Sequence, residues 1–244
     1  MLIKTLLTRN YLYLLILVLL ISNIFFASKS ALCCAQKTIN EYAGADVGGL
    51  ANDFIPTQVY ILGDSLTVGF GSSGSNMVDK LSSMLGPAWE IRNRGVGRNT
   101  TAQMFARLDR DILAPHNARY VIVWGGTNDV YQNVPPGETE SNLQAIYTAL
   151  HNEGIKVVSV NIPPSKLSPT WTQEIQNTVD EINMWIVNSA QNIDFKVDIY
   201  KALENPGMED SLLPIYHGGD FLHLNESGYF FVGESIYEAV DWKP

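Results

Sequence analysis

Short apolar runs rich in β-branched residues recur along the chain and alternate with segments in which apolar residues follow helical spacing. The runs predict strands at residues 59–62, 90–93, 120–124, 156–161 and 195–199. The helical spacing predicts helices at residues 77–85, 101–113, 138–152, 172–190 and 227–240, the last with Ser227 near its N-cap. Strands that alternate with helices through short connections are typical of an α/β fold, in which helices cover both faces of a parallel sheet. We therefore expect a three-layer α/β/α sandwich.

The expected sheet has a definite strand order. Five parallel strands match the flavodoxin-like order 2-1-3-4-5, in which the first strand lies between the second and the third. The segments that follow these three strands would then meet at the carboxyl end of the sheet, where α/β folds place their ligands. Residues far apart in the sequence can therefore form one site there.

The N-terminal residues differ in character from the rest of the chain. Basic residues precede a nearly continuous apolar run, residues 11–27, and small residues suited to signal cleavage follow it. We expect residues 1–35 to be a signal peptide or an uncleaved N-terminal membrane anchor, in which case residues 11–27 tether the protein. Residues 36–56 lack clear periodicity and are expected to be a linker before a domain at residues 57–244. Either kind of leader predicts export, to a secreted, periplasmic or cell-surface location.

Charge and cysteine content narrow the function classes. The chain has 16 Lys and Arg against 25 Asp and Glu, a formal net charge of −9, and no cluster of basic residues. Such an acidic protein is a poor partner for nucleic acid, because binding to the phosphate backbone needs Lys and Arg contacts. The only cysteines, Cys33 and Cys34, lie beside the N-terminal segment. The domain itself therefore has no disulfide, no thiolate nucleophile and no cysteine ligand for zinc.

Four short motifs carry the candidate chemistry. Gly63-Asp64-Ser65-Leu66 follows the first predicted strand, residues 93–97 follow the second, residues 126–129 follow the third, and Asp220-Phe221-Leu222-His223 lies near the C-terminus. A serine hydroxyl is a weak nucleophile that needs a base and a group that orients the base. The aspartate and histidine of the last motif are suited to these tasks. Their combination with a serine at the end of a buried strand favours acyl transfer.

These motifs resemble those of the SGNH hydrolases, the GDSL esterase/lipase family, and the resemblance spans about residues 57–241. It identifies residues 57–244 as an SGNH hydrolase domain with the α/β/α fold. It implies a serine esterase that hydrolyses carboxylic esters without a metal or organic cofactor. Short loops leave little material for a lid, so we expect a small or single-chain acyl group on a small-molecule, lipid or carbohydrate ester. An exported acyltransferase acting on a sugar or alcohol, and a noncatalytic carbohydrate-binding member of the fold, are the alternatives.

The resemblance also implies a role for each motif. Ser65 is the expected nucleophile, His223 the base that takes its proton, and Asp220 the carboxylate that orients the histidine. The backbone N–H groups of Ser65 and Gly95 and the side-chain amide of Asn128 are the expected oxyanion hole. Fixed donors of this kind stabilise the negative charge that forms on the carbonyl oxygen during attack.

Two further residues are expected at the substrate pocket. Trp171 follows the Pro-rich connection 163–169, which leaves the active end of the predicted sheet. His217 lies shortly before the last motif, where it would line the pocket or compete with His223 for the role of base.

Overall fold

A computed structural model describes residues 56–115 and 117–244 of the chain. The predicted leader, residues 1–35, and the predicted linker apart from Pro56 lie outside the described residues. Within the part that the structure describes, no helix combines the length and apolar character needed to cross a membrane.

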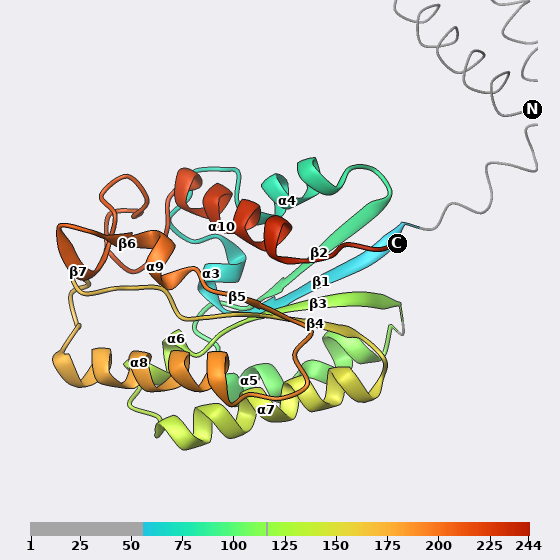
Figure 1. Ribbon diagram of the computed structural model, residues 1–244, viewed down its shortest axis with the longest axis horizontal. Coiled ribbons are helices and arrows are strands. Elements are labelled where there is room, and N and C mark those ends of the chain that lie inside the picture. The colour runs from blue at the N-terminus through green and yellow to red at the C-terminus, as the bar shows by residue number, and fades with distance from the viewer. Residues whose placement is uncertain (1–55, 116) are drawn as a thin grey trace, which may run out of the picture. The chain divides into compact units, whose positions relative to one another are not determined.

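A five-stranded parallel sheet forms the centre of the domain (Figure 1). Its strands are β1 (Thr57–Gly63), β2 (Trp89–Gly95), β3 (Ala118–Trp124), β4 (Lys156–Val160) and β5 (Phe195–Val197). They lie in the order β2-β1-β3-β4-β5, which confirms the predicted flavodoxin-like topology. Gly63 at the end of β1 pairs with Gly95 at the end of β2 and with Trp124 at the end of β3. The segments after these three strands therefore start at the same edge of the sheet.

Alternate residues of the strands face two separate apolar cores. On β1, Tyr60 and Leu62 pack into one core, whereas Val59 and Ile61 pack into the other. Both sets are fully buried, so the strand is apolar throughout instead of alternating with polar residues. Helices α5, α7 and α8 cover the first core, and α4 and α10 cover the second (Figure 1). The three-layer α/β/α sandwich is thus confirmed.

The helices begin where polar side chains can accept a hydrogen bond from the first turn. Asn76, Thr100, Thr172 and Asn225 cap α4, α5, α8 and α10 in this way. The helices are α3 (Ser65–Val68), α4 (Met77–Leu85), α5 (Thr101–Ala106), α6 (Thr127–Tyr131), α7 (Pro136–Asn152), α8 (Gln173–Asn188), α9 (Tyr200–Leu203) and α10 (Glu226–Ala239).

Two predicted elements differ from those observed. The helix expected at residues 101–113 is divided at Arg107, which ends α5, and continues as a short π-helix, Asp109–Leu113. The strand expected at residues 195–199 ends at Val197. It is followed by α9 and by a small antiparallel hairpin of β6 (Glu204–Asn205) and β7 (Met208–Leu212) that the sequence pattern did not indicate.

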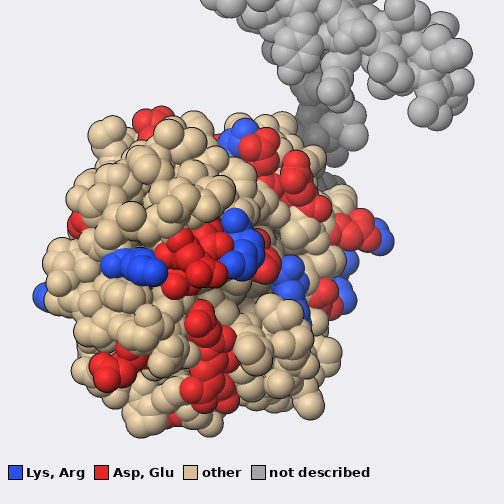
Figure 2. All heavy atoms as spheres, turned by 60° about the vertical axis from the view of Figure 1, so that its left-hand side comes forward, with Lys and Arg blue, Asp and Glu red and all other residues tan. Residues whose placement is uncertain are grey.

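Acidic side chains gather on the face of the domain seen in Figure 2, where red Asp and Glu groups form a band with Lys or Arg on either side. This distribution agrees with the net charge of −9. An anionic molecule that approaches this protein therefore meets a repulsive field unless a cation compensates for it locally.

Candidate active site

Ser65 is placed by a strand that turns directly into a helix. β1 ends at Gly63, and the Asp64 side chain accepts a hydrogen bond of 2.9 Å from the Leu66 amide, which starts α3 with Ser65 as its first residue. Gly63 has no room for a side chain, because a Cβ there would collide with the carbonyl oxygen of Trp124. The turn therefore brings the serine hydroxyl to the carboxyl end of the sheet.

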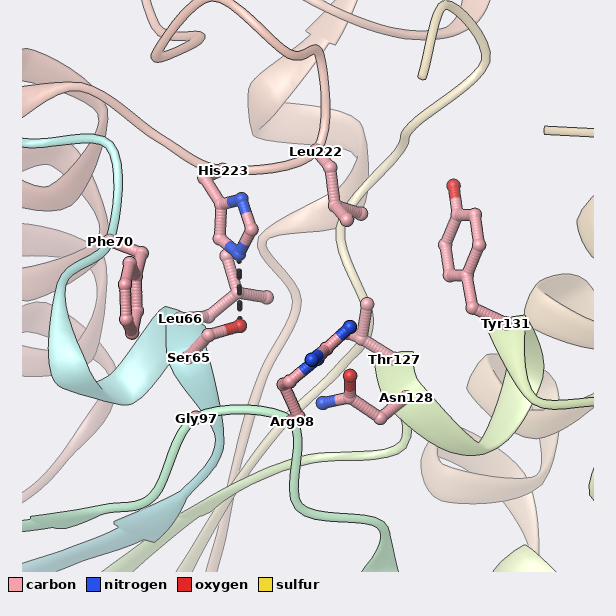
Figure 3. Close-up of a pocket in the computed structure, with 10 residues that line it drawn as sticks. All are labelled: Ser65, Leu66, Phe70, Gly97, Arg98, Thr127, Asn128, Tyr131, Leu222 and His223. Carbon is pink, nitrogen blue, oxygen red and sulfur yellow. Dashed lines mark hydrogen bonds between the residues drawn. The ribbon is translucent and has the colours of Figure 1, made fainter. Parts of the chain in front are cut away.

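His223 reaches Ser65 from a loop 158 residues further along the chain. Its Nε2 lies 2.9 Å from Ser65 Oγ, and its Nδ1 lies 2.6 Å from Asp220 Oδ2 (Figure 3). A carboxylate can only accept hydrogen bonds, so Nδ1 carries the proton and Nε2 is left to accept the Ser65 O–H. The Phe70 ring packs beside the imidazole with 5.9 Å between ring centroids. The three predicted catalytic side chains thus form one continuous relay.

Asp220 is held as an ionised acceptor. Partial burial disfavours its charge, but hydrogen bonds from the His223 side chain and from the amides of His223 and Leu222 outweigh this and keep the pKa of Asp220 below its ordinary value. The carboxylate is therefore charged at neutral pH and can stabilise a positive imidazolium.

Asn128 lies on α6, on the side of Ser65 away from His223 (Figure 3). Its Nδ2 donates to Asp64 Oδ2 and to the Asn99 carbonyl, each at 3.1 Å. Both N–H bonds are therefore used, and donation to a substrate oxygen requires one of them to be shared or released. Asp64 is buried at 1 % exposure, and this burial raises its pKa to about 6 despite the hydrogen bond from Leu66.

Gly95, whose N–H is the expected oxyanion-hole donor, lies where the end of β2 meets α3. Its N–H donates to Asn93 Oδ1 at 2.8 Å, and it does not line the cavity beside Ser65. A Cβ at this position would lie 2.6 Å from the Val68 nitrogen, so glycine lets the end of β2 approach α3. The same loop reaches the cavity two and three residues later, at Gly97 and Arg98.

A buried arginine, Arg107, holds this loop against the ends of β1 and β2 through hydrogen bonds. The Arg107 guanidinium donates to the carbonyls of Gly63 and Arg94, each at 2.8 Å, and to Asn99 Oδ1 at 2.8 Å. It also forms a 2.8 Å ion pair with Asp111. These bonds tie the ends of β1 and β2 to the segment that carries Arg98.

A cavity of about 460 Å³ opens beside Ser65 and His223. Leu66, Phe70 and Leu222 give it apolar walls, and Tyr131 stands at its far side (Figure 3). The remaining lining residues are Gly97, Arg98, Thr127 and Asn128. The nucleophile and its base therefore face a space of a size suited to a small organic molecule.

A family model for the GDSL-like lipase/acylhydrolase family matches residues 61–230, which include the nucleophile, the loop after β2, Asn128 and the histidine. The chain belongs to this family. The prediction of an ester hydrolase is thereby confirmed, as is the resemblance from which it came. No relative was found among curated proteins.

Solved structures share the fold of this hydrolase. A GDSL-like lipase from Bacteroides thetaiotaomicron is 22 % identical with a TM-score of 0.60, over 75 % of this chain and 86 % of that one. An acetyl xylan esterase is 23 % identical with a TM-score of 0.60, over 75 % and 99 %. A lipase/acylhydrolase from Enterococcus faecalis is 24 % identical with a TM-score of 0.59, over 74 % and 93 %.

The two residues expected at the pocket lie elsewhere in the hydrolase. Trp171 packs against the core between the sheet and α8, and its ring N–H donates to Gln176 at 3.3 Å. His217 stacks on Phe221 with 4.0 Å between ring centroids, and its Nδ1 accepts from the Gly219 amide. Neither lines the cavity, and it is His223 that is bonded to Ser65.

Arg98 is the charged residue among the cavity residues that sequence reasoning missed. It follows two glycines and has a φ of 68°, a left-handed conformation that is uncommon for residues other than glycine. A charged residue in such a turn is ordinarily expected to face the solvent, so the sequence around Arg98 did not indicate a place in the cavity.

Among residues 56–115 and 117–244, no group of three or more His, Cys, Asp or Glu side chains is arranged to hold a metal.

Proposed function

We propose that this hydrolase cleaves carboxylic esters of small or single-chain acyl groups through a covalent acyl intermediate on Ser65. The observation that carries the proposal is the relay from Ser65 Oγ through His223 to Asp220, with distances of 2.9 and 2.6 Å. A serine, a neutral imidazole nitrogen and an ionised carboxylate in this arrangement are the parts that activate a serine nucleophile.

The reaction proceeds in two halves. Ser65 Oγ attacks the ester carbonyl carbon while its proton moves to His223 Nε2, and the carbonyl oxygen becomes an anion. When the tetrahedral intermediate collapses, the carbon–oxygen bond to the alcohol breaks and His223 returns the proton to that alcohol. In the second half His223 takes a proton from water, which attacks the acyl carbon. The bond from this carbon to Ser65 Oγ then breaks, His223 returns the proton to Oγ, and the acid is released. Asp220 stabilises the imidazolium in both halves.

The oxyanion hole needs donors that face the cavity. We assign to it the Ser65 backbone N–H and the Asn128 side-chain amide. As the anion forms, one Asn128 N–H turns partly from Asp64 or Asn99 towards the substrate oxygen. The Gly95 N–H, which is bonded to Asn93, would likewise have to release its acceptor to serve as a donor. Gly97 and Arg98 line the cavity, and within the described chain their N–H groups have no acceptor, so the third donor belongs to one of them.

The volume and the walls of the cavity support the proposal of a small or single-chain acyl group. Its apolar walls and volume of about 460 Å³ suit an acetyl group or one acyl chain, and not the three chains of a triglyceride. The acetyl xylan esterase among the structural neighbours supports the proposal of a small acyl group. The alcohol that leaves is a small-molecule, lipid or carbohydrate hydroxyl.

Ser65→Ala tests the nucleophile. Hydrolysis of p-nitrophenyl esters by the folded variant should fall by at least about 10⁴-fold, and a fluorophosphonate probe should label the wild type but not the variant. Retention of a tenth of the wild-type rate would remove Ser65 from its role. A chain-length series of these esters should peak at short to medium acyl groups. Product analysis with added sugar or alcohol separates hydrolysis from acyl transfer, because transfer predicts an acylated acceptor in place of free acid.

We also propose that the protein is exported, on the strength of the apolar run at residues 11–27. Intact-mass analysis of the exported protein should show either loss of a leader of up to about 35 residues or a full-length chain in the membrane fraction. Full-length protein found only in the cytoplasm would refute export.

A further inference from the structure

We propose that the Arg98 guanidinium binds an anionic group of the ester, so that the enzyme prefers substrates with a carboxylate or phosphate near the scissile bond. The inference rests on the proposed function and deepens it, since it names a property of the substrate that the Ser65 relay does not determine. Arg98 lines the same cavity as Ser65, Asn128 and His223.

The first observation is that the loop holds Arg98 in place. Val96 N–H donates to the Gly63 carbonyl at 3.0 Å, and Asn99 N–H donates back to the Val96 carbonyl at 3.2 Å. The Asn99 side chain accepts from Arg107, and the Asn99 carbonyl accepts from Asn128. Residues on both sides of Arg98 are therefore anchored, and little backbone entropy remains to be lost when it binds a ligand.

The second observation concerns direction. In Figure 3 the Arg98 side chain extends from its loop past Asn128 towards Thr127 and lies to the side of the Ser65 hydroxyl, whereas His223 lies above that hydroxyl. His223 must lie beside the leaving oxygen to protonate it. The guanidinium thus lies apart from the base, in the same cavity, where a substituent on either half of a bound ester can meet it.

The third observation concerns charge. Among the described residues, Arg98 forms no ion pair and its guanidinium has no hydrogen-bond acceptor, whereas Arg92, Arg107 and Arg110 are each paired with a carboxylate. None of the described residues that line the cavity is an acid. In a protein of net charge −9, with acidic groups across the face in Figure 2, an unpaired cation beside the nucleophile is a local attraction for anions.

The chemistry of the group defines the ligand. A guanidinium presents a planar fork of N–H donors that matches the two oxygens of a carboxylate or phosphate. Arg98 is exposed, so water weakens the interaction. Discrimination of about tenfold between an anionic and a neutral ester is therefore expected, the low end for hydrogen bonds to charged groups.

The test compares matched ester pairs in the full-length enzyme. In one pair the acyl half differs: p-nitrophenyl monoadipate carries a terminal carboxylate, and p-nitrophenyl hexanoate does not. In the other pair the alcohol half differs: 4-acetoxybenzoate against its methyl ester. The kcat/KM ratio of anionic to neutral ester is measured for the wild type and for Arg98→Gln, Arg98→Lys and Arg119→Gln. Arg119 is an exposed arginine at the opposite, amino-terminal end of β3 and serves as the charge-matched control.

The inference predicts that Arg98→Gln lowers the ratio about tenfold in at least one pair, mainly through KM of the anionic ester. Arg98→Lys should restore part of it, because the charge remains while the fork is lost. Arg119→Gln should leave the ratio unchanged. The pair that responds identifies which half of the substrate carries the anion.

Equal ratios for the wild type and Arg98→Gln in both pairs would overturn the inference while leaving the esterase intact. An equal loss in Arg98→Gln and Arg119→Gln would also overturn it, because the effect would then come from total charge. Failure of the proposed function has a different signature: neither ester of a pair would be hydrolysed in a Ser65-dependent way.

Discussion

Replacing Asp64 by asparagine should remove a pH-dependent loss of stability, so that the variant gains stability relative to the wild type as pH rises. Asp64 is buried beside the nucleophile, and burial raises its pKa from the ordinary 3.8 to about 6. Above pH 6 the carboxylate is charged in the folded and the unfolded protein, and the folded state bears the cost of the buried charge. Below 3.8 it is neutral in both states. The contribution of Asp64 to stability is therefore highest in acid and is lost as pH rises through about 6.

The size of the effect follows from the two pKa values. The interval from 3.8 to about 6 corresponds to about 3 kcal/mol, at ~1.36 kcal/mol for each pH unit. Asparagine carries no charge at any pH. Its oxygen can still accept from the Leu66 amide, and the loss of the acceptor for Asn128 is the same at every pH. The free energy of unfolding of Asp64→Asn, minus that of the wild type, should therefore increase by about 2–3 kcal/mol between pH 4 and pH 8.

Urea unfolding at several pH values measures this difference. Constant effects of the substitution, such as altered packing, cancel because only the change with pH is compared. Glu90→Gln is the control. A hydrogen bond from Gln58 is the chief cause that lowers the pKa of Glu90, so this carboxylate is ionised in the folded and the unfolded protein above pH 5. The free energy of unfolding of Glu90→Gln, minus that of the wild type, should therefore not change with pH above 5. A difference for Asp64→Asn that varies by less than about 0.5 kcal/mol over the same range would refute the reasoning.

Asn128→Ala should lower kcat by about 10²–10³-fold with little change in KM, because its amide serves charge that exists only in the transition state. Asp220→Asn should leave the circular dichroism spectrum intact and lower kcat by about 10⁴-fold, because an amide can hold the wrong imidazole tautomer. Gly95→Ala should reduce stability by about 1–3 kcal/mol in urea unfolding, since its Cβ would meet the Val68 nitrogen at 2.6 Å. Ile61→Ala, in the fully buried centre of β1, should cost about 2–5 kcal/mol by the same measurement.

The sequence predicted those elements that local patterns determine. Residues 59–62 form a short apolar run that can be buried on both faces, and residues 77–85 have helical spacing. β1 and α4 follow these two patterns closely. The strand order was predicted from the count of five parallel strands, and the place of the site from the rule that α/β folds bind ligands at the carboxyl end of the sheet. Since the three strand ends then had to meet, the convergence of Ser65 with the later motifs was also predictable.

The details of the loop after β2 could not be predicted in the same way. The motif singled out Gly95, but the chain reaches the cavity at Gly97 and Arg98. This difference depends on contacts with residues distant in sequence, above all the bonds from Arg107 to the Gly63 carbonyl and to Asn99. Arg107 also lies at the break between α5 and the π-helix, and the helical spacing of apolar residues does not indicate this break.

The hydrogen bonds from Arg107 also affect which residues of the loop can change to alter substrate preference. Because buried bonds beneath the loop hold its shape, the outward positions Val96 and Arg98 are released from that task. A library that randomises these two positions and retains Arg107 and Asn99 should yield many folded enzymes with altered selectivity, with glycine and asparagine favoured at position 98 by its backbone conformation. Within one short segment, the residues open to adaptation are thus separate from those that preserve the chemistry.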